Sequence, residues 1–135
     1  LYTVGSIKDI PGIRKYVAID GGMYENPRYS LYQSKYTAVL ASDVNAPITQ
    51  KVSLAGKCCE SGDLIGVDIP LPEVKSGDIL AVLSTGAYHY SMASNYNRNF
   101  VPEVVLVSDG KAETIVKKQT YEDIIRNDLI PDRLK

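Results

Sequence analysis

The stretch VVLVSDGKAETIVKK, residues 104–118, is the part of the sequence that best indicates the fold. Apolar and β-branched residues lie on both sides of Asp109-Gly110, which is typical of a two-residue turn whose twist matches its flanking strands. The stretch therefore predicts an antiparallel hairpin.

Similar short β-branched runs, separated by turn-forming residues, occur along the rest of the chain. They predict strands over 15–20, 36–42, 48–56, 78–86 and 103–108. Helix signals are few. Thr120 with Asp123 three residues later predicts a short helix near 120–127, and residues 91–94 could form a single turn. We expect a mainly β fold, a sandwich or barrel with a short C-terminal helix, and one domain over residues 1–135.

The composition argues against several classes of function. The net charge of -1 and the absence of a basic run argue against a nucleic-acid or anionic-membrane partner. No apolar stretch approaches the roughly 20 residues that span a bilayer. Two cysteines and one histidine fit neither a zinc site nor a disulfide framework, so we expect no metal, reduced thiols and a cytoplasmic protein. Leu1 in place of Met indicates that the chain belongs to a longer polypeptide.

The familiar catalytic patterns are missing too. The sequence has no phosphate-binding glycine motif and no G-x-S-x-G nucleophile motif. We interpret the single histidine, His89, as a solvent-facing or satisfied imidazole and not as a catalytic base.

Cys59 and Glu60 lie where a predicted strand ends, at Gly56 or Lys57. A thiol can donate a proton and a carboxylate can hold an ammonium group, and loops on rigid strands often display such chemistry. The alternative is that the cysteines are small core residues and ESGD is only a turn.

Two further stretches have a similar character. Arg28 and Tyr32 are four residues apart and would share one face of a helix, offering a planar fork and a hydroxyl to an anion. The alternative is a surface arginine over a tyrosine ring. Tyr88 follows the small residues Gly86-Ala87 at the end of a predicted strand, where it could contact a ligand. The alternative interpretation is that Tyr88 is only a tyrosine at the rim of a sheet.

Several motifs, in order, carry a resemblance to a known family. They are YTVGSIKDIPGIRKYVAIDGGM (2–23), R-x-x-L-Y (28–32), CESGD (59–63), and GAY with SMASNYN (86–97). Together they resemble the C-terminal domain of the diaminopimelate decarboxylases over about residues 2–130. The chain departs from the family at Tyr29-Ser30, where Pro-Ala is frequent, and in RNFVPEV (98–104), where an Arg-Pro-rich run is frequent.

The resemblance implies a pyridoxal 5'-phosphate enzyme of the alanine-racemase-like group. Its N-terminal (α/β)8 barrel, with the lysine that forms the Schiff base, is absent from this chain, so we expect the chain alone to be inactive. The whole enzyme would convert meso-2,6-diaminopimelate to L-lysine and carbon dioxide as a homodimer, with active sites at the subunit interface.

The same resemblance assigns roles to individual residues. Arg28 and Tyr32 would bind a substrate carboxylate, and Glu60 the ammonium of the substrate's L-centre. Cys59, reaching into the partner's site, would protonate the carbanion, and Tyr88 would contact both cofactor and substrate. Cys58 would be a bystander, and Asp20 to Met23 receive no direct role.

Two alternatives remain open. One is a sister decarboxylase of the same fold that acts on arginine, ornithine or carboxynorspermidine. Glu60 and the Arg28–Tyr32 pair argue against it, because an enzyme that forms a diamine has no second carboxylate to hold. The other is a β-sandwich binding module without catalysis.

Overall fold

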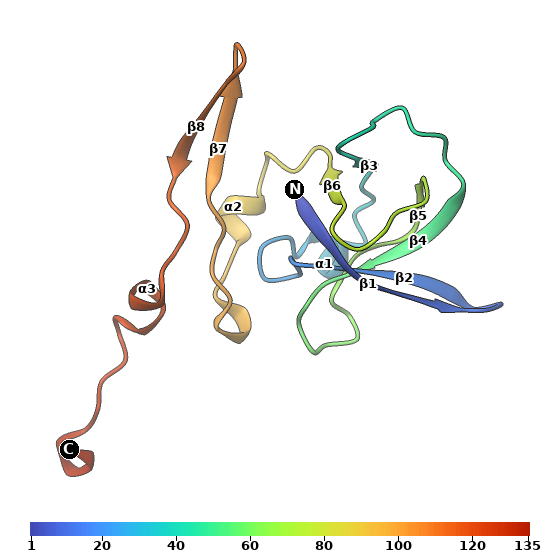
Figure 1. The fold of residues 1–135 in the computed structure, drawn as a ribbon. Helices are drawn as coiled ribbons and strands as arrows, with labels where there is room; N and C mark the ends of the chain where they lie inside the picture. Colours follow the sequence, from blue (N-terminus) through green and yellow to red (C-terminus); the bar gives the residue numbers. More distant parts are fainter. The chain divides into compact units, whose positions relative to one another are not determined.

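Residues 1–135 are all described in the computed structural model, and six strands from the first part of the chain form one sheet (Figure 1). Their alternating buried and exposed residues reflect strands with one face on a core. The strands are β1 (Tyr2–Ile10), β2 (Arg14–Ile19), β3 (Ala38–Leu40), β4 (Gln50–Ala55), β5 (Leu64–Leu71) and β6 (Ile79–Val82).

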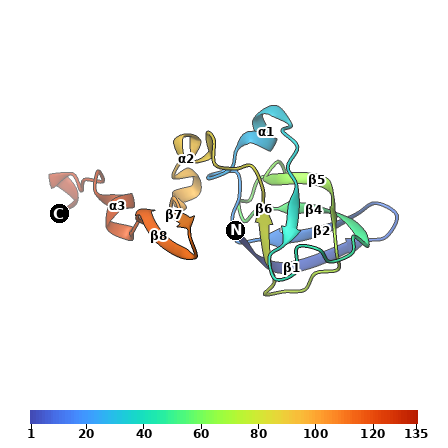
Figure 2. The ribbon, with the colours of Figure 1, turned by 90° about the horizontal axis from the view of Figure 1, so that it is seen from above.

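The sheet has the order β3-β6-β1-β2-β4-β5. β2 and β4 pair in parallel, and all other neighbours are antiparallel. The two edge strands, β3 and β5, also contact each other, so the sheet curves toward a barrel. Figure 2 shows β3 and β6 running across the direction of β2 and β4, as they do in a strongly curved sheet. The mainly β fold class predicted from the sequence is confirmed.

The core lies inside this curved sheet. Its members are aliphatic side chains from every strand, together with one tyrosine, and several are completely buried. The most deeply buried are Val17, Leu54, Ile65, Leu71 and Leu80.

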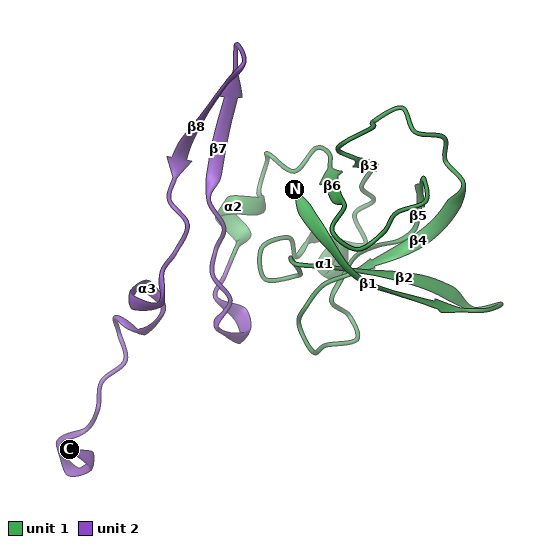
Figure 3. Ribbon diagram, in the orientation of Figure 1, with its two compact units in different colours: residues 1–93 green, residues 94–135 purple.

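Short helices join the strands. α1 (Arg28–Tyr32) follows β2 and packs against β5, and α2 (His89–Met92) follows β6. The chain separates into two compact units, residues 1–93 and 94–135, each described here by itself (Figure 3). The expectation of a single domain over 1–135 stays a prediction.

The second unit begins with a 3-10 turn, η1 (Tyr96–Arg98), and contains the predicted hairpin, β7 (Val104–Ser108) with β8 (Lys111–Val116). Asp109 and Gly110 both have positive φ, 51° and 74°, which is the geometry of a type I′ turn.

The unit ends with α3 (Tyr121–Ile125) and a 3-10 turn, η2 (Asp132–Leu134). Thr120 and Asp123 form the expected capping box. No helix in the chain has the length and apolar character that crossing a membrane requires.

Some predicted elements differ from the structure. β1 and β5 were not predicted as strands, because Gly5 with charged residues interrupts the first run and Asp68 with Pro70 interrupts the second. The helical turn predicted at 91–94 is instead α2, which begins earlier because the Tyr88 carbonyl accepts hydrogen bonds from Ser91 and Met92. β4 ends at Ala55, so both cysteines lie in a loop.

Candidate active site

The buried carboxylate of Asp63 joins two of the sequence motifs. Its two oxygens accept the backbone N–H groups of Met23 at 2.6 Å and Cys58 at 2.7 Å. Its own backbone pairs with Gly56 and Glu60, at 2.8 and 3.0 Å. The side chain is only 3% exposed. The CESGD loop is therefore closed on itself and tied to the DGGM loop by one side chain.

Two glycines make room for this carboxylate. A Cβ atom at Gly22 would lie 2.7 Å from the Asp63 Oδ2, and a Cβ at Gly56 would overlap the same carboxylate. Any larger residue would force the loops apart, because such distances are shorter than real contacts allow. This close approach accounts for glycine at both positions.

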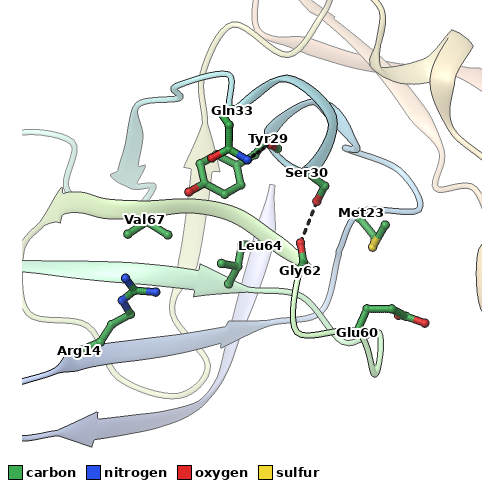
Figure 4. A pocket seen from close by; sticks show the side chains of 9 residues that line it. All are labelled: Arg14, Met23, Tyr29, Ser30, Gln33, Glu60, Gly62, Leu64 and Val67. Carbon is green, nitrogen blue, oxygen red and sulfur yellow. Dashed lines mark hydrogen bonds between the residues drawn. The ribbon is translucent and has the colours of Figure 1, made fainter.

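Cys59 and Glu60 lie side by side in the CESGD loop. The Cys59 thiol donates to the Glu60 Oε1 at 3.4 Å. Cys59 is exposed, and Glu60 is half-buried at the edge of a cavity of about 530 Å³ (Figure 4). We call this the Glu60 cavity. Its lining includes Arg14, Met23, Tyr29, Gln33, Glu60 and Val67.

The CESGD loop is also fixed to α1. The Ser30 hydroxyl donates to the Gly62 carbonyl at 2.8 Å (Figure 4). Tyr29-Ser30, where the chain departs from the family pattern, therefore supplies a contact to the candidate catalytic loop.

Cys58 differs from its neighbour. Burial, followed by the nearby Asp63 carboxylate, raises the pKa of the Cys58 thiol to about 11. The group is therefore protonated and unreactive near neutral pH.

Beneath the DGGM loop, burial raises the pKa of Glu25, whose Oε1 accepts the Gly22 N–H at 3.2 Å. Burial, followed by the Glu25 charge, raises the pKa of Tyr24 to about 12. These shifts result mainly from desolvation.

Arg28 lies close to two tyrosine rings. Residues 28–32 are helical, the condition under which Arg28 and Tyr32 would share a face, and the Arg28 Cζ lies 5.6 Å from the centre of the Tyr32 ring. It lies 4.9 Å from the centre of the Tyr88 ring, which comes from a segment far along the chain. Both distances suit cation–π contact. The rings orient the guanidinium, whose N–H groups can still meet an anion.

A second cavity, of about 370 Å³, lies beside this cluster. We call it the Arg28 cavity. Its lining contains two cations and several hydroxyl groups but no carboxylate, which favours an anionic group such as a carboxylate or phosphate. The lining residues are Arg28, Ser34, Lys35, Tyr36, Ser84, Ala87 and Tyr88.

Tyr88 has an unusual backbone conformation. Its φ of 75° and ψ of -33° are rare for a residue with a side chain and carry strain. The Ser91 hydroxyl donates to its carbonyl at 2.8 Å, which helps hold this conformation. The side chain is 64% exposed, so its ring and hydroxyl are accessible beside Arg28.

The predicted site residues thus form two groups. Arg28 contacts Tyr32 and Tyr88, and of these three Arg28 and Tyr88 line the Arg28 cavity. Cys59 contacts Glu60, which lines the Glu60 cavity. α1 contributes residues to both cavities, which are otherwise lined by different residues.

Sequence reasoning missed three buried residues that support these groups. Asp63 appeared only as a turn residue, and Asn26 and His89 received no role. Gly22 and Gly56 also received no role, although glycine at both positions is the one sequence feature that reflects the close approach of Asp63. No cluster of three or more His, Cys, Asp or Glu side chains could hold a metal ion.

Comparisons with known proteins agree with this architecture. Residues 1–86 match the family model of the pyridoxal-dependent decarboxylase C-terminal sheet domain. The diaminopimelate decarboxylase of Bacillus subtilis is 59% identical over 129 residues, which covers 96% of this chain and 29% of that protein. The chain thus spans less than a third of the curated relatives it matches.

Solved structures give the same result. The diaminopimelate decarboxylase of M. jannaschii superposes with a TM-score of 0.91 at 36% identity, covering 99% of this chain and 30% of that one. The same enzyme in complex with L-lysine superposes with a TM-score of 0.90.

Proposed function

This chain belongs to the C-terminal sheet domain family of the pyridoxal-dependent decarboxylases, and from that membership we propose that it is the sheet domain of a diaminopimelate decarboxylase. The whole enzyme would convert meso-2,6-diaminopimelate to L-lysine and carbon dioxide in the cytoplasm. The observation that carries the proposal is the Arg28 guanidinium in contact with the rings of Tyr32 and Tyr88, in the lining of a cavity that contains cations and hydroxyl groups.

Arg28 and Tyr32 would bind the carboxylate at the L-centre of the substrate. A guanidinium offers two parallel N–H donors to a carboxylate, and the tyrosine hydroxyl adds one directed bond. L-Lysine keeps this L-centre carboxylate but has none at the reacting carbon, and placing its only carboxylate at the cofactor would leave Arg28 without a partner. This difference would prevent the enzyme from consuming its own product.

Glu60 would pair with the ammonium at the same L-centre. A site that holds both charges of that centre selects the end of a nearly symmetric substrate, because a wrong orientation strands one charge. Cys59 would then deliver a proton from its Sγ to the carbon that has lost the carboxylate. Its hydrogen bond to Glu60, 3.4 Å long, orients the thiol.

The separation of the two groups supports a homodimer. Arg28 and Glu60 line different cavities of one chain. We propose that the pair serves the active site of the partner subunit, while the Arg28 group serves the site beside the chain's own N-terminal barrel.

The cofactor would be pyridoxal 5'-phosphate, attached to a lysine outside these residues. When bound, it supplies an electron sink for the electron pair released as carbon dioxide leaves. The exposed Tyr88 and the cations of the Arg28 cavity fit an anionic cofactor or substrate group. Tyr88 would contact both.

Carbon dioxide release tests the proposal. The full-length gene product with pyridoxal phosphate is offered meso-diaminopimelate, L-lysine, ornithine and arginine in parallel. We expect release from meso-diaminopimelate alone. Release from ornithine or arginine instead would keep the mechanism but overturn the substrate, and release from none would favour a binding module.

A further inference from the structure

His89 is the only histidine of the chain, and its imidazole is buried, with 8% of the residue exposed. The Nδ1 atom lies 3.0 Å from the Ala87 carbonyl oxygen, and the Nε2 atom lies 2.8 Å from the Asn26 Oδ1. The ring also meets the Tyr36 ring edge-on, with centres 5.4 Å apart. These contacts fit the interpretation of His89 as a satisfied imidazole. They also join the ring to the segments that carry Tyr88 and Arg28, which indicates a structural role.

The hydrogen bonds define how the ring and the amide are arranged. A carbonyl oxygen can only accept, so the Ala87 contact places a proton on the His89 Nδ1. In a neutral imidazole the Nε2 then accepts, and the Asn26 amide must turn its N–H toward it. The Asn26 Nδ2 is buried without a hydrogen-bond partner when the Oδ1 faces the ring, and the turned amide gives it one.

The two hydrogen-bond partners of the His89 ring are close in sequence to Tyr88 and Arg28, whose side chains are in cation–π contact. Ala87 immediately precedes Tyr88, and Asn26 lies two residues before Arg28. Asn26 is itself completely buried, and its N–H donates to the Gly22 carbonyl at 3.1 Å. His89 therefore forms a short, buried link between the backbone that carries Tyr88 and the backbone that carries Arg28.

Strain at Tyr88 makes such a link necessary. A residue with φ of 75° and ψ of -33° keeps that conformation only when its surroundings fix it. The His89 ring holds the carbonyl before Tyr88, and the Ser91 hydroxyl holds the carbonyl of Tyr88 itself. The ring of Tyr88 is thereby kept 4.9 Å from the Arg28 guanidinium carbon.

We propose that His89 is a positioning residue, which through Ala87 and Asn26 holds Tyr88 in its strained conformation against Arg28. It touches neither substrate nor cofactor in this role. The inference rests on the proposed function for its kinetic consequence, but its structural consequence is independent of it.

The test uses the full-length enzyme with three variants of His89. His89→Leu removes both hydrogen bonds, His89→Asn retains a donor near the Nδ1 position, and His89→Gln retains a polar group near the Nε2 position. Val17→Ala is the matched control. Val17 is completely buried in the core of the sheet, so its truncation lowers thermal stability without touching either cavity.

For meso-diaminopimelate, we expect His89→Leu to lower kcat/KM at least tenfold, mainly through KM, since displacing a binding group by about 1 Å can cost up to a hundredfold. His89→Gln and His89→Asn should recover part of the loss. Val17→Ala should stay within twofold of the wild type at a similar loss of Tm. A fall in His89→Leu no larger than in the control would overturn the proposal.

Crystal structures of the full-length His89→Gln and His89→Leu proteins provide a readout that needs no activity. We expect Tyr88 to leave its positive φ in the leucine variant and to move away from Arg28. An unchanged Tyr88 would overturn the inference. If the wild type decarboxylates no substrate, the proposed function fails, and these structures still decide the role of His89. If His89→Leu does not fold, His89→Gln and His89→Asn decide the question by the same two measurements.

Discussion

The Asp63 carboxylate accepts the backbone N–H of Met23 at 2.6 Å, across 40 residues of sequence. With the second bond from Cys58 it makes the DGGM and CESGD loops one structural unit. Hydrogen bonds to an ionised acceptor are stronger than neutral ones, and here both donors are backbone N–H groups. The candidate catalytic residues Cys59 and Glu60 thus depend on a residue that does no chemistry.

Replacing this carboxylate should destabilise the sheet domain. We expect Asp63→Ala to lower the free energy of unfolding by about 3 kcal/mol, because two buried N–H groups lose a charged acceptor. Asp63→Asn keeps one acceptor oxygen and should lose less. Denaturant titration of the full-length protein, monitored by a probe within the sheet domain, measures the free energy of unfolding of each variant. Equal stability of the alanine variant and the wild type would contradict the assignment.

The glycines beside Asp63 allow a second test. Gly56→Ala places a methyl group on the Asp63 carboxylate and should lower the free energy of unfolding by about 1–3 kcal/mol. Gly62→Ala is the matched control, since a Cβ at Gly62 meets nothing within 4 Å and its φ is not positive. If the two variants unfold at the same denaturant concentration, the close approach is not what requires glycine at position 56.

These contacts show what the sequence could and could not reveal. The spacing of Arg28 and Tyr32 indicated a shared face on the condition that the segment is helical, because such a contact depends only on the pitch of a helix. The Tyr88 ring reaches Arg28 through a turn in the backbone, and no local pattern encodes such a pairing. β5 was missed for a related reason. Asp68 and Pro70 disfavour a strand locally, whereas pairing with β4 and burial of Ile65, Ile69 and Leu71 favour it.

The two adjacent cysteines provide a controlled test of proton donation. We expect Cys59→Ser to lower kcat for meso-diaminopimelate by about a hundredfold with KM within threefold, because a general acid typically contributes 10²–10⁴ in rate. Cys58→Ser, one residue away, should change neither constant by more than twofold. Steady-state rates of carbon dioxide release give kcat and KM for both variants. Similar kinetics of the two variants would assign the proton to water or to another group.

Arg28 should hold a carboxylate that the substrate and the product share. Arg28→Lys keeps the charge but loses the planar fork, and we expect KM for meso-diaminopimelate to rise about ten- to hundredfold. The inhibition constant of L-lysine should rise by a similar factor, because lysine keeps the L-centre carboxylate that Arg28 would hold. Arg133→Lys, an exposed change outside both cavities, is the control and should leave both constants unaltered. A loss for meso-diaminopimelate without a loss for L-lysine would place Arg28 against the carboxylate of the reacting D-centre instead.

The pKa of Cys58 makes thiol reactivity and stability depend on pH. Burial raises this pKa from its ordinary 9.0 to about 11, so at pH 9 the thiolate fraction is on the order of one in a hundred instead of one half. Because the folded pKa is above the unfolded one, the folded state binds the proton more tightly. The associated stabilisation is complete below pH 9 and is lost as the pH rises through about 11.

Alkylation by iodoacetamide, followed at the Cys58 peptide by mass spectrometry, measures this shift. We expect the rate in the folded protein to rise with a midpoint near pH 11, and in guanidinium chloride near pH 9, where the thiol is solvated. A folded midpoint near 9 would mean that Cys58 is not desolvated by its loop. It would then also weaken the case that Asp63 closes the CESGD loop, because the same packing produces both effects.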